Sequence, residues 1–208
     1  MIHRLPTVYP ITDTRLSGIS HGEQVKRLSA GGATLVQLRE KNLSPAEFYL
    51  EARAALEIAR QNRVRIIIND RVDIASALGA DGVHLGQDDL PPLAARKLLG
   101  EEAIIGFSTH NIEQAREAIS LPINYLAIGP IFETRTKKDT APVVGLNGIR
   151  KIREIAGHLP IVAIGGITLE NAREVLDAGA DSVAVIRTLL SEADALAERT
   201  RNLIERLS

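Results

Sequence analysis

The chain has 208 residues, of which 45% are hydrophobic and 25% charged, with a formal net charge of −1; this predicts one soluble domain, residues 1–208, that buries about 70% of its unfolded surface. The balanced charge and an aromatic content of 3% argue against nucleic acid as a partner. No apolar run approaches the roughly 18 residues of a membrane span, so we expect no membrane partner. Nothing at the N-terminus resembles a signal peptide, and cysteine is absent, so we expect a cytoplasmic protein.

Short apolar segments alternate with longer amphipathic segments along the chain. The apolar segments predict eight strands, at residues 7–11, 34–39, 65–69, 82–85, 104–108, 125–129, 160–164 and 182–186. Helices are expected between them, one opening on a capping box at Ser44-Pro45-Ala46-Glu47 and the last covering about residues 192–207. Eight such units predict an α/β fold with a single (β/α)8 TIM barrel, whereas a flavodoxin-like open sheet needs only about five.

The predicted strand at 34–39 carries polar side chains where a buried parallel strand is normally apolar. Because strand side chains alternate, Gln37, Arg39 and Lys41 point to one side. Two buried cations cost several kcal/mol if they are unpaired. An internal salt bridge is one solution, but Glu40 falls on the opposite face, so we favour an anionic ligand.

Carboxylates follow two of the predicted strands at the end where barrels of this type carry their chemistry. Asp70 comes after the third strand, and Asp88 and Asp89 come after the fourth. Two carboxylates with phosphate oxygens and water form a common Mg²⁺ shell, because this ion prefers oxygen ligands. The alternative is a helix cap, with Asp70 capping a helix that begins near Val72. Asp89 has the same alternative before Pro91, and both roles can coexist.

Later strand ends offer groups for a second anion. Gly165-Gly166 precedes a helix expected to open near Thr168, which suits close approach to a phosphate; a tight turn is the alternative. The loop at residues 134–138 presents hydroxyls and cations suited to oxyanion recognition, or is a solvated loop.

Three further side chains near the predicted strands carry hydroxyl or imidazole groups. Ser108 has no base near it in the sequence, so we expect a hydrogen-bond donor and not a nucleophile. His84 interrupts an apolar strand, and a hydrogen-bonded core histidine and a functional one are both open. His21 is expected to be peripheral.

Seven segments in chain order resemble the thiamine-phosphate synthase family, which shares the (β/α)8 fold. They lie at residues 9–13, 37–41, 69–71, 84–90, 106–110, 134–137 and 163–167, and so cover nearly the whole chain. The resemblance implies that two small-molecule substrates, a hydroxymethylpyrimidine diphosphate and a thiazole phosphate or its carboxylated form, are joined with release of diphosphate. The oligomeric state stays open, and a homodimer is compatible with the sequence.

The resemblance also implies roles for individual residues. Mg²⁺ is held at Asp70 and Asp89. The pyrimidine diphosphate lies against Gln37, Leu38, Arg39, Glu40, Lys41, Asn69, Ser108 and Lys137. The thiazole phosphate is expected at Thr134, Arg135, Thr136, Gly166, Ile186 and Arg187. Arg187 departs from the family, which usually has a small hydroxyl residue there.

The implied reaction is dissociative: diphosphate leaves first, and the thiazole nitrogen captures the resulting pyrimidine-methyl cation. Such a reaction needs no general base, but it needs neutralisation of the leaving group, for which Mg²⁺, Arg39, Lys41 and Lys137 are the candidates. One alternative is a thiazole tautomerase-like isomerase, which needs neither the cations nor the carboxylates and wants a histidine near the sixth strand, where none occurs. A non-catalytic barrel that binds a phosphate ligand is the other.

Overall fold

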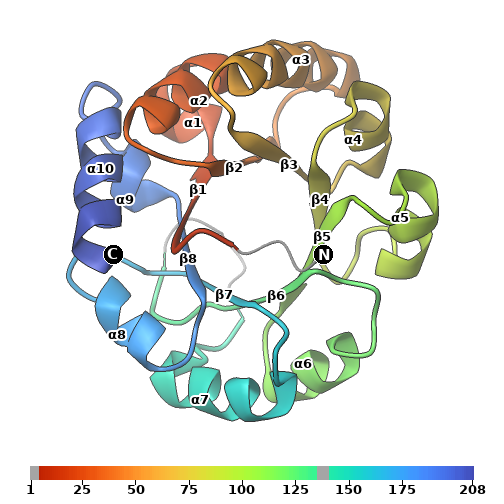
Figure 1. Ribbon diagram of the computed structural model, residues 1–208, viewed down its shortest axis with the longest axis vertical. Coiled ribbons are helices and arrows are strands. Elements are labelled where there is room, and N and C mark those ends of the chain that lie inside the picture. Colours follow the sequence, from red (N-terminus) through yellow and green to blue (C-terminus); the bar gives the residue numbers. More distant parts are fainter. Residues whose placement is uncertain (1–4, 135–140) are drawn as a thin grey trace.

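The structure is a computed structural model in which residues 5–134 and 141–208 are described. Eight parallel strands close into a barrel in sequence order, from β1 to β8, and β8 pairs with β1 (Figure 1). The strands are β1 (Val8–Thr12), β2 (Leu35–Leu38), β3 (Arg65–Asn69), β4 (Gly82–Leu85), β5 (Ile104–Thr109), β6 (Tyr125–Ile128), β7 (Ile161–Ile164) and β8 (Ser182–Val185). The predicted (β/α)8 TIM barrel is confirmed.

Helices surround the barrel, and the last helix, α10, packs against α2 (Figure 1). Their bounds are α1 (Thr14–Ser17), α2 (His21–Ala30), α3 (Pro45–Gln61), α4 (Val72–Leu78), α5 (Pro92–Leu99), α6 (Ile112–Ala118), α7 (Gly145–Ala156), α8 (Ala172–Asp177), α9 (Arg187–Leu190) and α10 (Leu196–Leu207). Ser44 begins α3 with the predicted capping box, in which its hydroxyl and the Glu47 carboxylate each accept a backbone N–H.

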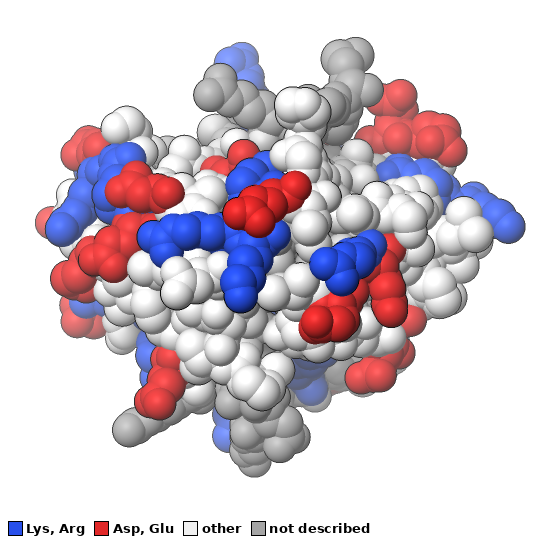
Figure 2. Space-filling view, turned by 90° about the horizontal axis from the view of Figure 1, so that it is seen from below, with Lys and Arg blue, Asp and Glu red and all other residues white. Residues whose placement is uncertain are grey.

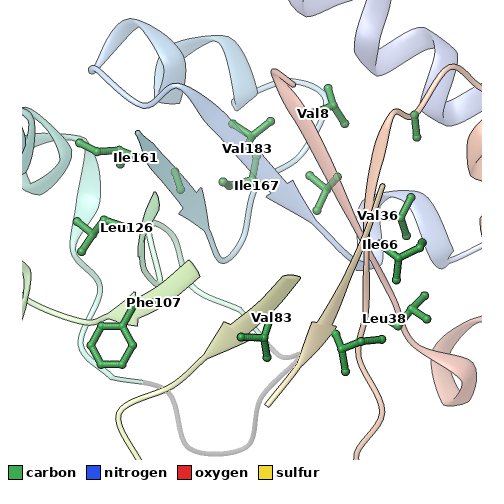
Figure 3. Close-up of a cluster of buried hydrophobic side chains, with 14 of the residues drawn as sticks. Val8, Val36, Leu38, Ile66, Val83, Phe107, Leu126, Ile161, Ile167 and Val183 are labelled. Atoms are coloured by element: carbon green, nitrogen blue, oxygen red, sulfur yellow. The ribbon is translucent and has the colours of Figure 1, made fainter. Parts of the chain in front are cut away.

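Alternation of side chains along each strand separates two apolar layers. Residues such as Val36, Ile66 and Val83 point outward and pack with the helices, and Figure 3 shows part of this layer. The intervening residues point into the barrel, where Leu35 and Ile67 belong to a separate buried cluster. Gln37 and His84 belong to this inward set, whereas the charged side chains of the site follow the strands.

Two predicted boundaries are wrong in ways that matter for the site. β2 ends at Leu38, so Arg39 and Lys41 follow the strand and lie at the mouth of the barrel instead of inside it. The helix expected near Thr168 begins at Ala172, and the Thr168 amide instead donates to the Asn171 side chain. The last helix begins at Leu196, a few residues later than expected.

Charges of both signs are interspersed on the surface. On the face in Figure 2, Lys and Arg side chains lie beside Asp and Glu side chains, as the net charge of −1 leads one to expect. None of the helices in the described part of the chain combines the length and apolar character that crossing a bilayer requires.

Candidate active site

Arg39 lies at the mouth of the barrel, where it pairs with Asp13 from the neighbouring strand end. Its Nη1 is 3.0 Å from Asp13 Oδ2, and the two side chains are only 15% and 16% exposed. The register of β1 and β2 opposes Thr12 to Leu38, so the next residue of each strand, Asp13 and Arg39, meets the other. The internal salt bridge that the sequence left open is therefore present for Arg39, with Asp13 and not Glu40 as its partner, and the anionic ligand stays a prediction.

Lys41 is also paired, with Asp70 at the end of β3. Asp70 adopts the left-handed conformation, with φ of 63°, and its backbone N–H donates to the His84 carbonyl at 2.8 Å. This unusual backbone turns the Asp70 carboxylate toward the ammonium of Lys41. A cation thus already lies against this carboxylate.

Asp89 joins the same cluster from the loop after β4. Burial raises the pKa of the Asp89 carboxyl, the N–H of Gly86 at 2.7 Å lowers it, and the neighbouring carboxylate of Asp70 raises it again. Two adjacent carboxylates at a partly buried strand end destabilise one another unless a cation lies between or beside them. Their chemistry fits Mg²⁺, which takes one or two carboxylates and completes its shell with water and phosphate oxygens.

The capping alternatives for these carboxylates are wrong. The residue that precedes α4 is Arg71, and no side chain caps that helix. Pro91 precedes α5, which also lacks a side-chain cap. Within the described residues no group of three or more His, Asp or Glu side chains could hold a metal by protein ligands alone, so a metal here would need oxygens from a substrate or water.

Glu40 holds the loop after β2. Its carboxylate accepts the backbone N–H groups of Lys41 at 2.7 Å, Asn42 at 2.6 Å and Leu43 at 3.3 Å, and the Thr14 hydroxyl at 2.8 Å. Burial opposes ionisation of Glu40, but these donors together lower its pKa to about 2. The carboxylate is therefore a structural anchor that positions Lys41.

His21 is buried beneath this loop and is not peripheral as expected. Its Nδ1 lies 2.7 Å from the Thr12 hydroxyl and its Nε2 lies 3.4 Å from Glu40. Burial lowers the pKa of His21, although the Glu40 carboxylate raises it. The ring thus packs under the loop instead of facing solvent.

Polar side chains inside the barrel form one continuous chain of hydrogen bonds. Gln37 Nε2 donates to the Tyr9 hydroxyl at 3.2 Å, and the Tyr9 and Tyr125 hydroxyls are 3.0 Å apart. The Tyr125 hydroxyl lies 2.9 Å from His84 Nδ1, and His84 Nε2 lies 2.8 Å from the Ser108 hydroxyl. His84 is thus a hydrogen-bonded core histidine, and a functional role for it stays a prediction.

The opposite side of the mouth is built by β6, β7 and β8. Gly166 has φ of 67°, and a Cβ there would come within 2.6 Å of the Glu133 carbonyl, so the loop that carries Thr134 packs directly on it. Ile186 is half-buried before α9, whereas Arg187 is exposed. Arg135, Thr136 and Lys137 lie outside the described residues.

Three of the remaining candidates have clear positions. Asn69, the last residue of β3, is 7% exposed. The Leu38 side chain packs in the layer between strands and helices, so only its backbone faces the mouth. Ser108 is half-buried near the end of β5.

Sequence reasoning missed three residues of this site: Asp13, Tyr9 and Tyr125. Asp13 follows an apolar strand just as Asp70 does, which is a usable signal once the strand register is known. The two tyrosines look like ordinary aromatic core residues, and nothing in their spacing reveals that they meet across the barrel, 116 positions apart.

The fold and the site together define a TIM-barrel protein whose strand ends gather paired cations, adjacent carboxylates and a buried polar chain. The family model for thiamine monophosphate synthase matches residues 8–189. The thiamine-phosphate synthase of Chloroflexus aurantiacus is 44% identical over 200 residues, 95% of this chain and 92% of the relative. That of Koribacter versatilis is 48% identical over 194 residues, 90% of each chain.

A solved structure agrees with these sequence matches. The thiamine phosphate pyrophosphorylase of Pyrococcus furiosus superposes with a TM-score of 0.88 at 38% identity, covering 99% of this chain and 96% of the other. The chain therefore belongs to the thiamine monophosphate synthase family and is an enzyme of that family.

Proposed function

We propose that the enzyme joins 4-amino-2-methyl-5-(diphosphooxymethyl)pyrimidine to 4-methyl-5-(2-phosphoethyl)thiazole, or its carboxylated form, and releases thiamine phosphate and diphosphate. The observation that carries this proposal is the cluster of Lys41, Asp70 and Asp89, in which carboxylates and a cation from three neighbouring strand ends share one position. Such a cluster suits a diphosphate bound with a divalent cation better than a single phosphate.

The reaction needs the departing diphosphate to be stabilised more than the bound ester. Arg39 is held by Asp13 and Lys41 by the Glu40-anchored loop, so both cations are positioned before a ligand arrives. Charges that need no rearrangement lower the barrier most effectively. Lys137 supplies a third cation in this proposal.

A metal site completes the leaving-group assignment. Asp70 and Asp89 are the proposed Mg²⁺ ligands, and bound Mg²⁺ would supply Lewis-acid stabilisation of the charge that develops on the diphosphate. The chain's own contribution is the orientation of both substrates, with Gln37, Asn69 and Ser108 proposed at the pyrimidine. Thr134, Arg135, Thr136, Gly166, Ile186 and Arg187 are proposed at the thiazole phosphate.

The proposed mechanism is dissociative because the described strand ends supply cations that can stabilise a departing diphosphate. His84, which belongs to the hydrogen-bond chain inside the barrel, has both ring nitrogens engaged, with Tyr125 and Ser108. A ring nitrogen of the thiazole needs no proton removed before it attacks. A pyrimidine-methyl cation formed by loss of diphosphate is therefore captured by proximity alone.

Variants of the proposed diphosphate site test this assignment. Asp70→Ala and Lys137→Ala are expected to lower turnover by orders of magnitude, because each removes a charge that stabilises the leaving group, while circular dichroism stays unchanged. Lys151→Ala, at an exposed position of α7, is the control and should keep full turnover. If the turnover of either variant is unchanged, the substituted residue does not belong to the diphosphate site.

A further inference from the structure

The hydrogen-bond chain in the barrel has a direction that can be worked out from its members. Gln37 Nε2 donates to Tyr9, so among the described residues the Tyr125 oxygen is the acceptor that remains for the Tyr9 proton. Tyr125 must then donate to His84 Nδ1, which leaves the ring proton on Nε2, where it is donated to Ser108.

Every hydroxyl in this chain stays protonated. Tyr9 is 1% exposed and Tyr125 is fully buried, and burial raises the pKa of both above the ordinary value of 10.0. Each phenol therefore has one proton to donate and must find an acceptor, because an unpaired buried donor is costly. The direction of the hydrogen bond at Gln37 thus fixes the direction of the hydrogen bond at Ser108.

The barrel interior is shaped around this chain. A Cβ on Gly106 would lie 2.0 Å from the Tyr125 ring, so only glycine leaves room for it. The ring of His84 stacks on Tyr125 with centroids 5.6 Å apart and an interplanar angle of 15°, and Tyr9 meets Tyr125 edge to face at 5.9 Å. Packing thus holds the three rings so that their polar atoms face one another.

We propose that Tyr9 and Tyr125 are positioning residues that make Gln37 present its carbonyl oxygen, and Ser108 its hydroxyl proton, to the substrate at the mouth. An aminopyrimidine matches this arrangement, because its exocyclic amine donates and its ring nitrogens accept. The inference rests on the proposed function, since Gln37 and Ser108 are the residues assigned to the pyrimidine. The 4-oxo counterpart, which carries a carbonyl in place of the amine, has the reverse polarity and is disfavoured.

Removal of one hydroxyl has a different effect at each tyrosine. In Tyr125→Phe the Tyr9 proton loses its acceptor, and the Gln37 amide can restore one only by turning its carbonyl toward Tyr9. Gln37 then presents its NH₂ group to the substrate, which opposes the amine. In Tyr9→Phe no partner forces Gln37 to turn, and Tyr125 still donates to His84, so the effect is smaller.

The test compares kcat/KM for the aminopyrimidine diphosphate and for its 4-oxo counterpart. Tyr125→Phe should lower the amino-to-oxo ratio by about 10- to 100-fold, as expected for one reversed hydrogen bond at a buried site. Tyr9→Phe should lower this ratio less. Tyr49→Phe, the same change at the third tyrosine, which lies outside the chain of bonds on α3, should leave it unchanged. A merely structural role would reduce kcat/KM for both substrates and leave the ratio intact, and that result would overturn the proposal.

A second readout does not depend on activity. In ¹⁵N-histidine spectra of the unmodified enzyme, the His84 signals, assigned by their loss in His84→Gln, should report a neutral ring with its proton on Nε2. A proton on Nδ1 would mean that the chain runs the other way and would contradict the proposal. If the enzyme forms no product from either pyrimidine, the proposed function fails, but this spectrum still decides the direction of the hydrogen bonds from Gln37 to Ser108.

Discussion

Asp89 is a side chain whose negative charge opposes the stability of the folded protein. Its carboxylate is partly buried beside that of Asp70, and both effects raise the pKa of the Asp89 carboxyl. In Asp89→Asn the side-chain oxygen can still accept the Gly86 N–H, but the second negative charge is gone. The metal-free variant should therefore be more stable than the natural enzyme by about 1 kcal/mol.

Thermal unfolding with and without Mg²⁺ measures both the stability of the metal-free protein and its gain on binding Mg²⁺. We expect the natural enzyme to gain Tm when Mg²⁺ is added, since a ligand that binds only the folded state stabilises it. Asp89→Asn should start a few degrees higher and show no gain. Asp88→Asn is the matched control at an exposed neighbour and should respond to Mg²⁺ like the natural enzyme. An equal Mg²⁺ response in Asp89→Asn would exclude Asp89 as a ligand.

At the residue scale, the sequence identifies charges more readily than their partners. Arg39 and Lys41 could be recognised as anomalous, but their pairing with Asp13 and Asp70 depends on which strands are neighbours and in which register. The polar chain through Tyr9 and Tyr125 depends on ring packing across the barrel and leaves no periodic signal. Contacts of this kind follow from three-dimensional closure and not from local pattern.

The loop after β2 is the element on which the diphosphate proposal depends most. A single carboxylate, Glu40, ties three consecutive backbone N–H groups and the Thr14 hydroxyl together. Strand alternation placed Glu40 on the face opposite Arg39, and the family resemblance implied only a contact with the pyrimidine diphosphate. A carboxylate that folds back on its own loop cannot be recognised from strand alternation, because the strand has already ended at Leu38.

Acid should weaken this loop within a defined range. The folded-state pKa of Glu40 is about 2 and the ordinary value is 4.5, so its contribution is complete above about pH 4.5 and is lost as pH falls toward 2. The side chain is 2% exposed, so solvent screening is small. The contribution lost between pH 6 and pH 3 is about 2 kcal/mol.

Urea unfolding at these two pH values can isolate the contribution of Glu40. Glu40→Gln should be less stable than the natural enzyme at pH 6, and the difference should shrink by about 2 kcal/mol at pH 3. Glu57→Gln makes the same change at an exposed position of α3 and should follow the natural enzyme at both values. A difference that stays constant with pH would show that the Glu40 carboxylate is not held ionised by the loop.

Strand and helix positions were predicted more accurately than their ends. The segments 65–69 and 82–85 match β3 and β4 residue for residue, since apolar runs bounded by turn residues define them. The end of β2 and the start of α8 were wrong, because at both places side-chain hydrogen bonds and not apolar pattern end or begin the element. Asn171, which accepts from Thr168 and donates to the Gly166 carbonyl, explains the second case.

At the scale of the whole molecule, closure of the barrel brings the residues of the site together. Pairing of β1 with β8 brings the strand ends into one ring, so Asp13, Asp70 and Ser108 share a mouth although they are far apart in sequence. The regular alternation of eight units was enough to predict this topology. It could not predict which strand-end groups pair, since that requires the register of all eight strands.

Product stoichiometry is the most direct measurement of the central claim. The protein is incubated with Mg²⁺, the pyrimidine diphosphate and the thiazole phosphate, and phosphorus-containing species are followed by ³¹P NMR. We predict one thiamine phosphate and one diphosphate for each pair of substrates consumed, and no product when Mg²⁺ is chelated or either substrate is omitted. Rearrangement of the thiazole phosphate without the pyrimidine, or binding of both substrates without turnover, would contradict the proposed synthase reaction.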